Sequence, residues 1–187
     1  LSKSGTETTV KLFADWIADA EKGFVCPDGG TKNGALHVGS GKFILDLNGY
    51  TLDRNADKNA ASYASSVLYV NDCTFTLVDT SAEQDGKITG GYSQKGGGIY
   101  AEDANLYINS GNITGNKSVL SGGGIHVLGC ETKMNGGSVT DNESEIGGGI
   151  YSERVEEILG GLPYGTLEVN DGLIARNTAT YVGNYGG

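Results

Sequence analysis

Several residue types are scarce in this sequence, and each shortage excludes a class of protein. Lysine and arginine number 13 against 23 aspartates and glutamates, which gives a formal net charge of −10 at pH 7. A surface of this sign repels nucleic-acid phosphates and anionic membranes, so no nucleic-acid partner is expected. No run approaches the roughly 20 apolar residues that cross a bilayer, and residues 1–10 lack the basic start and apolar core of a signal peptide. Membrane insertion by this fragment is therefore not expected.

Cysteine and histidine are also scarce, with 3 and 2 copies. Aligning VLYVNDC (67–73) with GIHVLGC (124–130) places Cys73 and Cys130 at one position, two repeats apart. At a strand spacing of about 4.8 Å the two lie ~10 Å apart, too far for a disulfide. Together with Cys26 they are predicted to be free, buried thiols. Neither a metal site nor a cofactor is expected, because a metal needs clustered Cys or His ligands.

Glycine is abundant, at 32 residues against 2 prolines, and much of it falls in one repeated phrase. The phrase opens as GGGIY (96–100), GGGIH (122–126) and GGGIY (147–151), and each opening is followed by NSGNITGN (109–116), NGGSVTDN (135–142) or NDGLIARN (170–177). A fixed period in this range indicates stacked supersecondary units. Because the chain begins without Met and stops on GG inside a repeat, we expect it to be truncated at the C-terminus, a piece of a larger protein.

Apolar residues between these phrases alternate with polar ones, as in half-buried strands. Three rows of inward side chains are predicted. The first row is Leu36, Leu68, Ile99, Ile125 and Ile150, and the residues two positions later, Val38, Val70, Ala101, Val127 and Ser152, also point inward. The second row is Leu45, Leu47, Phe75, Leu77, Leu106, Ile108, Met134, Leu167 and Val169, and the third is Leu52, Ile88, Ile113, Val139 and Ile174. Three short strands per repeat, separated by Gly, Asn and Asp turns, predict an all-β, three-sided parallel solenoid of about five coils over residues 35–187.

Residues 9–22 predict a helix, because Val10, Phe13, Trp16, Ile17 and Ala20 fall on one helical face. An apolar-faced helix in front of a repeat array is typical of a terminal cap. We therefore expect residues 1–34 to form an N-terminal capping α-helix and a lead-in, within a single domain overall.

Two rows of asparagine are predicted at the turns. One row is Asn48, Asn109, Asn135 and Asn170, and the other is Asn55, Asn116, Asn142 and Asn177. Asparagine tolerates left-handed backbone, and stacked amides bond to one another along the axis of an array. These residues are therefore predicted to be structural ladders.

The motifs GGGI, NxGx[IV]xxN and LDLNGYTL (45–52) together resemble the right-handed parallel β-helix repeat proteins of microbial cell surfaces. A more distant similarity links them to the GGxI and FxxN repeats of polymorphic outer-membrane proteins, with Ile113, Val139 and Ile174 where those have Phe. The resemblance covers residues 35–187. It implies a right-handed β-helix in an extracellular or cell-surface, adhesin-like protein.

The wider superfamily includes pectate lyases and polygalacturonases, which gather carboxylates on one sheet. Here the outward position of the second strand is predicted to hold one charge or none per coil, in Asp46, Thr76, Tyr107, Lys133 and Glu168. No catalytic residue is therefore predicted. A carbohydrate-active enzyme of this type, or its ancillary polysaccharide-binding module, remains the alternative function.

One outward row is aromatic, formed by His37, Tyr69, Tyr100, His126 and Tyr151. Flat rings with polar tips suit sugar faces, so this row is a candidate glycan-binding strip; the competing interpretation is that stacked rings only stabilise the sheet. The function expected is a non-enzymatic surface module, a rigid spacer with a contact surface for glycans or surface proteins. An open strand edge also allows end-to-end self-association.

Overall fold

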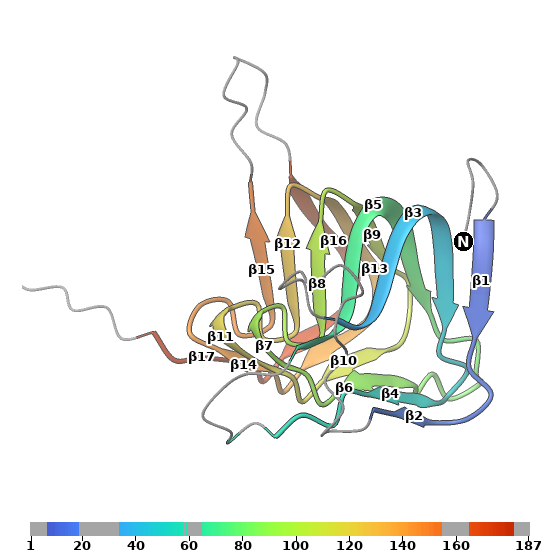
Figure 1. Ribbon diagram of the computed structural model, residues 1–187, viewed down its shortest axis with the longest axis horizontal. Helices are drawn as coiled ribbons and strands as arrows, with labels where there is room; N and C mark the ends of the chain where they lie inside the picture. The colour runs from blue at the N-terminus through green and yellow to red at the C-terminus, as the bar shows by residue number, and fades with distance from the viewer. Residues whose placement is uncertain (1–6, 19–33, 58, 60–64, 155–164, 182–187) are drawn as a thin grey trace, which may run out of the picture.

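The computed structural model describes residues 7–18, 34–57, 59, 65–154 and 165–181, and these form β-strands and turns (Figure 1). The predicted all-β class is confirmed. No helix that could cross a membrane occurs in the described part of the chain. The strands are β1 (Glu7–Lys11), β2 (Trp16–Ile17), β3 (Gly34–Asp46), β4 (Thr51–Asp53), β5 (Ser66–Val78), β6 (Lys87–Thr89), β7 (Tyr92–Lys95), β8 (Ile99–Glu102), β9 (Asn105–Ile108), β10 (Asn112–Thr114), β11 (Lys117–Ser121), β12 (Ile125–Leu128), β13 (Glu131–Thr140), β14 (Glu143–Ser144), β15 (Ile150–Glu153), β16 (Thr166–Ala175) and β17 (Thr178–Ala179).

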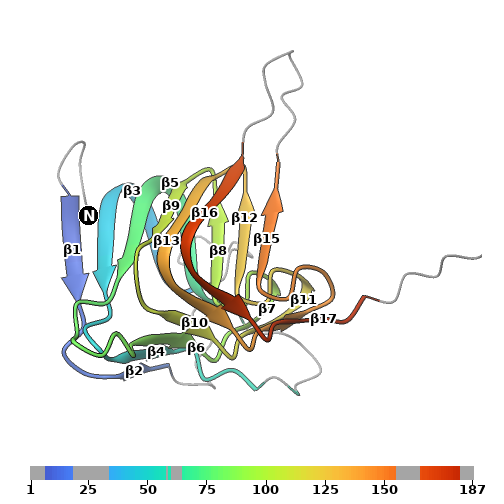
Figure 2. The ribbon, with the colours of Figure 1, turned by 180° about the vertical axis from the view of Figure 1, so that it is seen from behind.

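Each strand pairs in parallel with the strand at the same position of the neighbouring repeat (Figures 1 and 2). Ile99 in β8 is opposite Ile125 in β12, which is opposite Ile150 in β15. The pairings form a 13-stranded sheet that bends around the molecule and a 4-stranded sheet of β7, β11, β14 and β17. This arrangement is consistent with a β-solenoid.

The inward rows follow the repeat almost as predicted. The strand register confirms the first row and its companion, Leu36 to Ile150 and Val38 to Ser152, and also the row Leu52, Ile88, Ile113, Val139 and Ile174. The second strand contributes two rows, one of Phe43, Phe75, Leu106, Thr132 and Leu167 and one of Leu45, Leu77, Ile108, Met134 and Val169. In the middle repeats these side chains are almost fully buried. Each such aliphatic side chain contributes about 1.5–3 kcal/mol of burial free energy, which is realised only when repeats stack.

The glycine triplets let one repeat lie directly against the next. A Cβ added to Gly97 would lie 2.4 Å from the carbonyl oxygen of Gly123, and one added to Gly123 would lie 2.4 Å from that of Gly148. No side chain fits at either position, because both contacts are to backbone of the neighbouring repeat. The repeated GGG phrase is thus explained by close approach between repeats.

The predicted capping helix is wrong over its described residues, because β1 and β2 are strands there; its remainder, 19–22, lies outside the described residues. Strand β1 pairs with β3, and β2 pairs with β4. Of the five residues expected to face the core, Val10 is 50% exposed, Phe13 79% and Ile17 62%, and Ala20 lies outside the described residues. Trp16 packs against the core, as does Leu12. The open edges of β3 and β4 supply backbone hydrogen bonds to this segment, and tertiary pairing of this kind overrides a helical apolar pattern.

Candidate functional site

The five predicted aromatic residues lie in one continuous row across β3, β5, β8, β12 and β15. Strand register places them opposite one another in the order His37, Tyr69, Tyr100, His126 and Tyr151. Their ring centroids are 4.9, 5.6, 5.4 and 5.2 Å apart along the row. We call this set the aromatic row.

The rings of the aromatic row cover one another along the row, and only part of their surface is exposed. Tyr69 is 1% exposed and His126 is fully buried, although both were expected on an open outer face. Three of the four neighbouring ring pairs are inclined by only 26–31°, so each ring presents its face to the next repeat. A sugar that stacks on an aromatic ring needs a free face, and of these residues only His37 is exposed. The geometry therefore favours the structural interpretation of the row.

His126, at the centre of a polar cluster, is the residue most perturbed by this burial. Its Nδ1 shares a 2.9 Å hydrogen bond with the Ser121 hydroxyl, and its Nε2 lies 3.3 Å from a carboxylate oxygen of Glu153 without hydrogen-bond geometry. Glu153 is bound in turn by the ammonium of Lys95, at 3.1 Å. Burial, with a smaller contribution from the charge of Lys95, lowers the pKa of His126 to about 4, against the opposing effect of Glu153. The imidazole is therefore neutral at physiological pH.

Ser121, His126 and Glu153 have the residue types of a hydrolase triad, but they are not placed to act as one. A nucleophile must be reached by its substrate, and Ser121 is only 6% exposed beside the fully buried ring of His126. Within the described residues, no group of three or more His, Cys, Asp or Glu side chains is placed to hold a metal ion. The cluster is thus a partly buried polar contact around His126 of the aromatic row.

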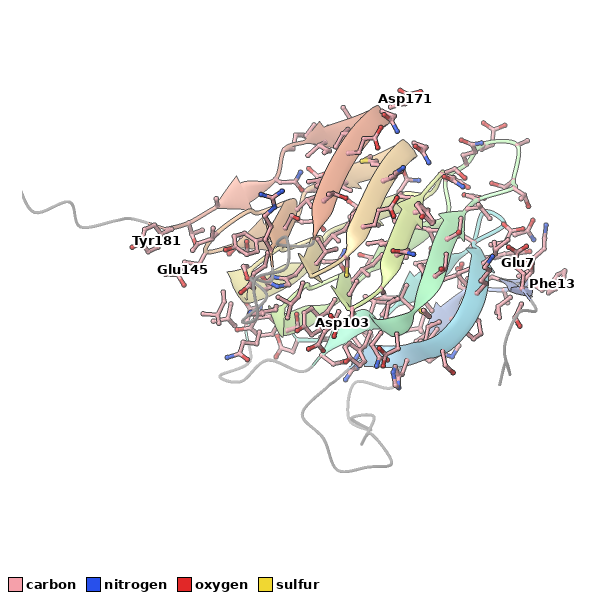
Figure 3. The ribbon with its side chains drawn as sticks, turned by 90° about the horizontal axis from the view of Figure 1, so that it is seen from above. Glu7, Phe13, Asp103, Glu145, Asp171 and Tyr181 are labelled. Atoms are coloured by element: carbon pink, nitrogen blue, oxygen red, sulfur yellow. The ribbon has the colours of Figure 1, made fainter. Side chains whose placement is uncertain are left out.

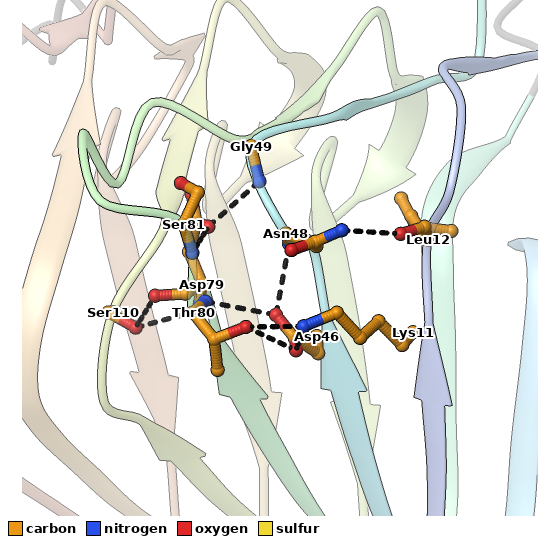
Figure 4. Close-up of polar contacts among 9 residues, drawn as sticks. All are labelled: Lys11, Leu12, Asp46, Asn48, Gly49, Asp79, Thr80, Ser81 and Ser110. Carbon is orange, nitrogen blue, oxygen red and sulfur yellow. Dashed lines mark hydrogen bonds and ion pairs between the residues drawn. The ribbon is translucent and has the colours of Figure 1, made fainter.

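Two buried carboxylates, missed by the sequence analysis, fix the turns beside β3 and β5 (Figure 4). Asp46 accepts hydrogen bonds from the backbone N–H groups of Asn48 and Thr80 and from the Thr80 hydroxyl, and its other contact is an ion pair with Lys11 at 3.1 Å. Asp79 accepts from the backbone N–H groups of Gly49, Ser81 and Gly86, at 2.7–3.0 Å. Every carboxylate oxygen of the pair therefore has at least one donor.

Both carboxyl groups are held ionised by these donors. Burial on its own would raise the pKa of Asp46, but the Thr80 hydroxyl and the other donors outweigh it and lower the pKa below the usual value. The pKa of Asp79 is lowered in the same way, by hydrogen bonds from Ser81, Gly86 and Gly49 that outweigh burial. Asp46 was expected on the outward row with Thr76, but the register places Ile44 there. With every acceptor occupied, the pair acts as a structural staple between neighbouring repeats.

The predicted asparagine rows are each joined over three repeats. In the first row, Asn170 donates its amide to Asn135, and Asn135 donates to Asn109. Asn48 does not join them: it has φ 48° and donates to the carbonyl of Leu12. In the observed register, the residues that share a row with Asn109 are Asp46 and Val78, and not Asn48.

The second asparagine row is buried in its centre. Asn116 donates to Asn142 at 3.1 Å, and Asn142 donates to Asn177 at 3.0 Å. Asn55 does not reach this row; it has φ 54° and its amide donates to the carbonyl of Ala18. The continuous ladder therefore begins at Asn116, whose side-chain carbonyl also accepts a hydrogen bond from the N–H of Gly91.

A shallow, open trough of about 690 Å³ follows the corner between the first and second strands of each repeat, as between β8 and β9. Its lining includes Lys42, Asp72, Thr74, Asp103 and Asn105. Asp72 and Asp103 occupy left-handed turns with φ 49° and 50°. Charges of both signs in an open trough give no concentrated acid or base, so the trough carries no chemistry of its own.

Cys73 and Cys130 are free and buried, as predicted, and Cys26 lies outside the described residues. Register places Ala104 between them, so the two thiols are two strands apart. Burial raises the pKa of Cys73 to about 11, and it also raises that of Cys130. Neither thiol is therefore a reactive nucleophile at neutral pH.

Comparison of the chain with protein-family models, with curated proteins and with solved structures found no match.

Proposed function

We propose that this chain is a non-enzymatic β-helical module of an extracellular or cell-surface protein, which acts as a rigid spacer and presents a contact surface along its side. The finer architecture proposed is a right-handed, three-sided parallel β-helix. In its support, one repeat contributes β8, β9 and β10 to three separate places in the large sheet, with β5 between β8 and β9 and β13 between β9 and β10, and the short β11 follows them in the chain. The repeat resemblance to microbial surface proteins supports the location.

The observation that carries this proposal is the continuity of like contacts from repeat to repeat. Aliphatic rows, the aromatic row and two amide ladders each run across several strands in register. Polar groups within the His126 cluster contact one another, and the carboxylates of the staple bind the turns of neighbouring repeats. Side chains that contact the neighbouring repeat make the stack of repeats long and stiff, which is what a spacer requires.

The side face also offers an exposed apolar ridge, which is the best candidate contact surface. Val119, Leu120, Ile146 and Tyr181 are 38–60% exposed. Backbone hydrogen bonds join Ile146 to Leu120 and Tyr181 to Glu145, so the ridge crosses three neighbouring repeats. Exposed apolar side chains that continue along an array are typical of a contact site. We therefore propose this ridge, instead of the half-buried aromatic row, as the surface that meets a glycan or a surface protein.

A glycan array probed with this chain tests the contact function, with the double variant Leu120→Ser/Ile146→Ser as the test of the ridge. Binding that is lost in the double variant and kept in Tyr100→Phe, which changes the half-buried aromatic row, supports the ridge. Cleavage of pectic polysaccharide, measured as new reducing ends or unsaturated sugar ends, would overturn the non-enzymatic assignment and favour the pectate-lyase-like alternative.

A further inference from the structure

The three asparagines of the exposed ladder are followed by different residues in successive repeats. Asn109 is followed by Ser110, Asn135 by Gly136 and Asn170 by Asp171. The side chain of Asn135 is exposed, and Figure 3 shows its register partner on β16, Asp171, at the outer edge of the molecule. The middle of this ladder is therefore an Asn–Gly pair in contact with solvent.

Packing between repeats requires the glycine after Asn135. A Cβ added to Gly136 would lie 2.4 Å from the backbone carbonyl oxygen of Asn109 in the neighbouring repeat, which leaves no room for a side chain. Gly137, next in the chain, has φ 73°, in the left-handed region that favours glycine. Neither glycine has a partner in the register of β13 with β9, β10 or β16. The fold thus places a two-glycine bulge directly after an exposed asparagine.

The ladder also polarises the side-chain amide of Asn135. Its carbonyl oxygen Oδ1 accepts a hydrogen bond from the amide of Asn170 at 2.9 Å. A donor at this oxygen stabilises the negative charge that develops there when a nucleophile adds to Cγ. The nearest nucleophile in the chain is the backbone nitrogen of Gly136, and glycine has no Cβ to hinder its approach to Cγ. The carbonyl carbon and its attacking nitrogen are therefore supplied by adjacent residues.

We propose that Asn135 is a modification site, at which the folded chain converts its own side-chain amide into a carboxylate. The Gly136 nitrogen forms a bond to Cγ of Asn135, the bond from Cγ to Nδ2 breaks, and ammonia leaves with the proton of the former N–H. Water then opens the succinimide ring at either of its two carbonyl carbons and gives aspartate or isoaspartate. Water is the co-reactant, and no oxidant or reductant is needed. This inference is independent of the proposed surface function.

The modification changes the ladder as well as the residue. In the unmodified chain Asn135 donates its amide to Oδ1 of Asn109 at 3.0 Å. A carboxylate has no N–H to donate, so the contact between these two repeats is lost and one negative charge is added to the exposed side.

Two other asparagines of the chain serve as internal controls. Asn48 also precedes a glycine, but the Gly49 N–H donates to the Asp79 carboxylate at 2.9 Å. This nitrogen must give up a hydrogen bond to a charged group before it can attack, which slows the reaction by about tenfold or more. Asn109 lies in the same ladder as Asn135, but it precedes Ser110, whose Cβ hinders the attack.

Peptide mapping by mass spectrometry tests the proposal on the folded protein, incubated in mildly alkaline buffer and digested at intervals. Conversion at Asn135 is expected to be about tenfold faster, or more, than at Asn48 and at Asn109. Electron-transfer fragmentation is expected to find isoaspartate at position 135, which marks a succinimide intermediate. The variant Asn135→Gln has a side chain longer by one methylene and is expected to stay unmodified.

The same incubation in concentrated urea separates the effect of the fold from that of the sequence. In the unfolded chain Asn135 and Asn48 both precede a free glycine, so their conversion rates are expected to be similar. A smaller difference between Asn135 and the two controls in the folded protein would overturn the proposal. So would the same preference for Asn135 over Asn48 in urea, or a product at position 135 that contains no isoaspartate.

Discussion

His37 and His126 occupy the same row, yet their environments are opposite, because one ring is exposed and the other has no exposed surface. The difference arises from position in the stack: His126 has a ring on either side and Ser121 and Glu153 at its edge. A neutral ring suits this site, because charging it would leave an ammonium-like group out of contact with water. The burial of His126 therefore links folding to pH.

The variant His126→Tyr tests this link. The folded pKa of about 4 lies below the ordinary value of 6.5, so as pH falls the unfolded chain takes up the proton first. The stability due to the neutral ring is full above about pH 6.5 and is lost on the way down to about pH 4, by roughly 3 kcal/mol. Tyrosine occupies this position in neighbouring repeats, so His126→Tyr is expected to remove that loss, measured as the free energy of urea unfolding across this range.

The matched control is His37→Tyr, at the exposed end of the same row. A profile that is flattened equally in this control would contradict the assignment to His126. The carboxylates Asp46 and Asp79 act in a lower window: their pKa values are depressed, so the stability that they contribute is present above about pH 3.9 and falls only as pH drops through their folded values.

Thr132 is a polar residue in an otherwise apolar row, and its replacement by an apolar residue is expected to stabilise the fold. It lies between Leu106 and Leu167 in register, it is 1% exposed, and its hydroxyl has no hydrogen-bond partner. The variant Thr132→Val keeps the shape and removes the unsatisfied group, so it is expected to raise the free energy of unfolding by about 1–2 kcal/mol. The control Thr140→Val removes a hydroxyl that bonds to Thr114 and is not expected to stabilise; equal gains in both variants would show that hydrophobicity alone is responsible.

At the scale of the element, the two asparagine ladders differ in burial and should therefore differ in energy. Asn142 is 1% exposed, donates to the carbonyl of Ile113 and to Asn177, and accepts from the N–H of Asn116. The variant Asn142→Ala leaves these buried groups without partners and is expected to cost about 2–4 kcal/mol in urea unfolding. Asn135→Ala, in the exposed ladder, is expected to cost less than about 1 kcal/mol. Similar losses at both sites would mean that burial does not decide the contribution.

The sequence predicted the strand rows well because their signal is local and repeated. A glycine triplet, an Ile directly after it and an NxGx[IV]xxN turn recur in the same order in each repeat, so each repeat predicts the register of the next. Before residue 96 that phrase is absent, and there the predictions for the turn residues failed. Asn48 and Asn55 were predicted in ladders that they do not join, and Asp46 was predicted on an open face.

The helix predicted over residues 9–22 failed for a different physical reason. Its apolar spacing is compatible with a helix, but the segment also lies at the free edge of β3 and β4, and a strand satisfies both its own backbone groups and those of the edge. The exposure of the aromatic row could not be predicted either. Lys95 and Ser121, which lie beside His126, are on β7 and β11, whose position against the row depends on the path of the whole repeat.

At the scale of the molecule, the stacking of repeats sets the distances between residues that are far apart in the sequence. Disulfide formation by the buried thiols can report these distances. Cys73, Ala104 and Cys130 hold one position in three consecutive repeats. Neighbouring repeats are about 4.8 Å apart, within the Cα separations of about 4.4–6.8 Å that a disulfide spans, whereas two repeats are too far. A residue at position 104 lies next to both Cys73 and Cys130 and can therefore form a disulfide with either of them.

The variant Ala104→Cys, made in a Cys26→Ser background, turns this spacing into a measurement. Oxidation of the folded protein is expected to leave one free thiol of three, with the new disulfide mapped by mass spectrometry to Cys73 or Cys130. The parent, with two thiols, is expected to keep both. A disulfide between Cys73 and Cys130 in the parent would place these repeats side by side and contradict the stack, and three thiols that persist in the variant under conditions that oxidise its unfolded chain would contradict the register at Ala104. Because the result depends on the path of the chain and not on any surface property, it tests the architecture on which the spacer function depends.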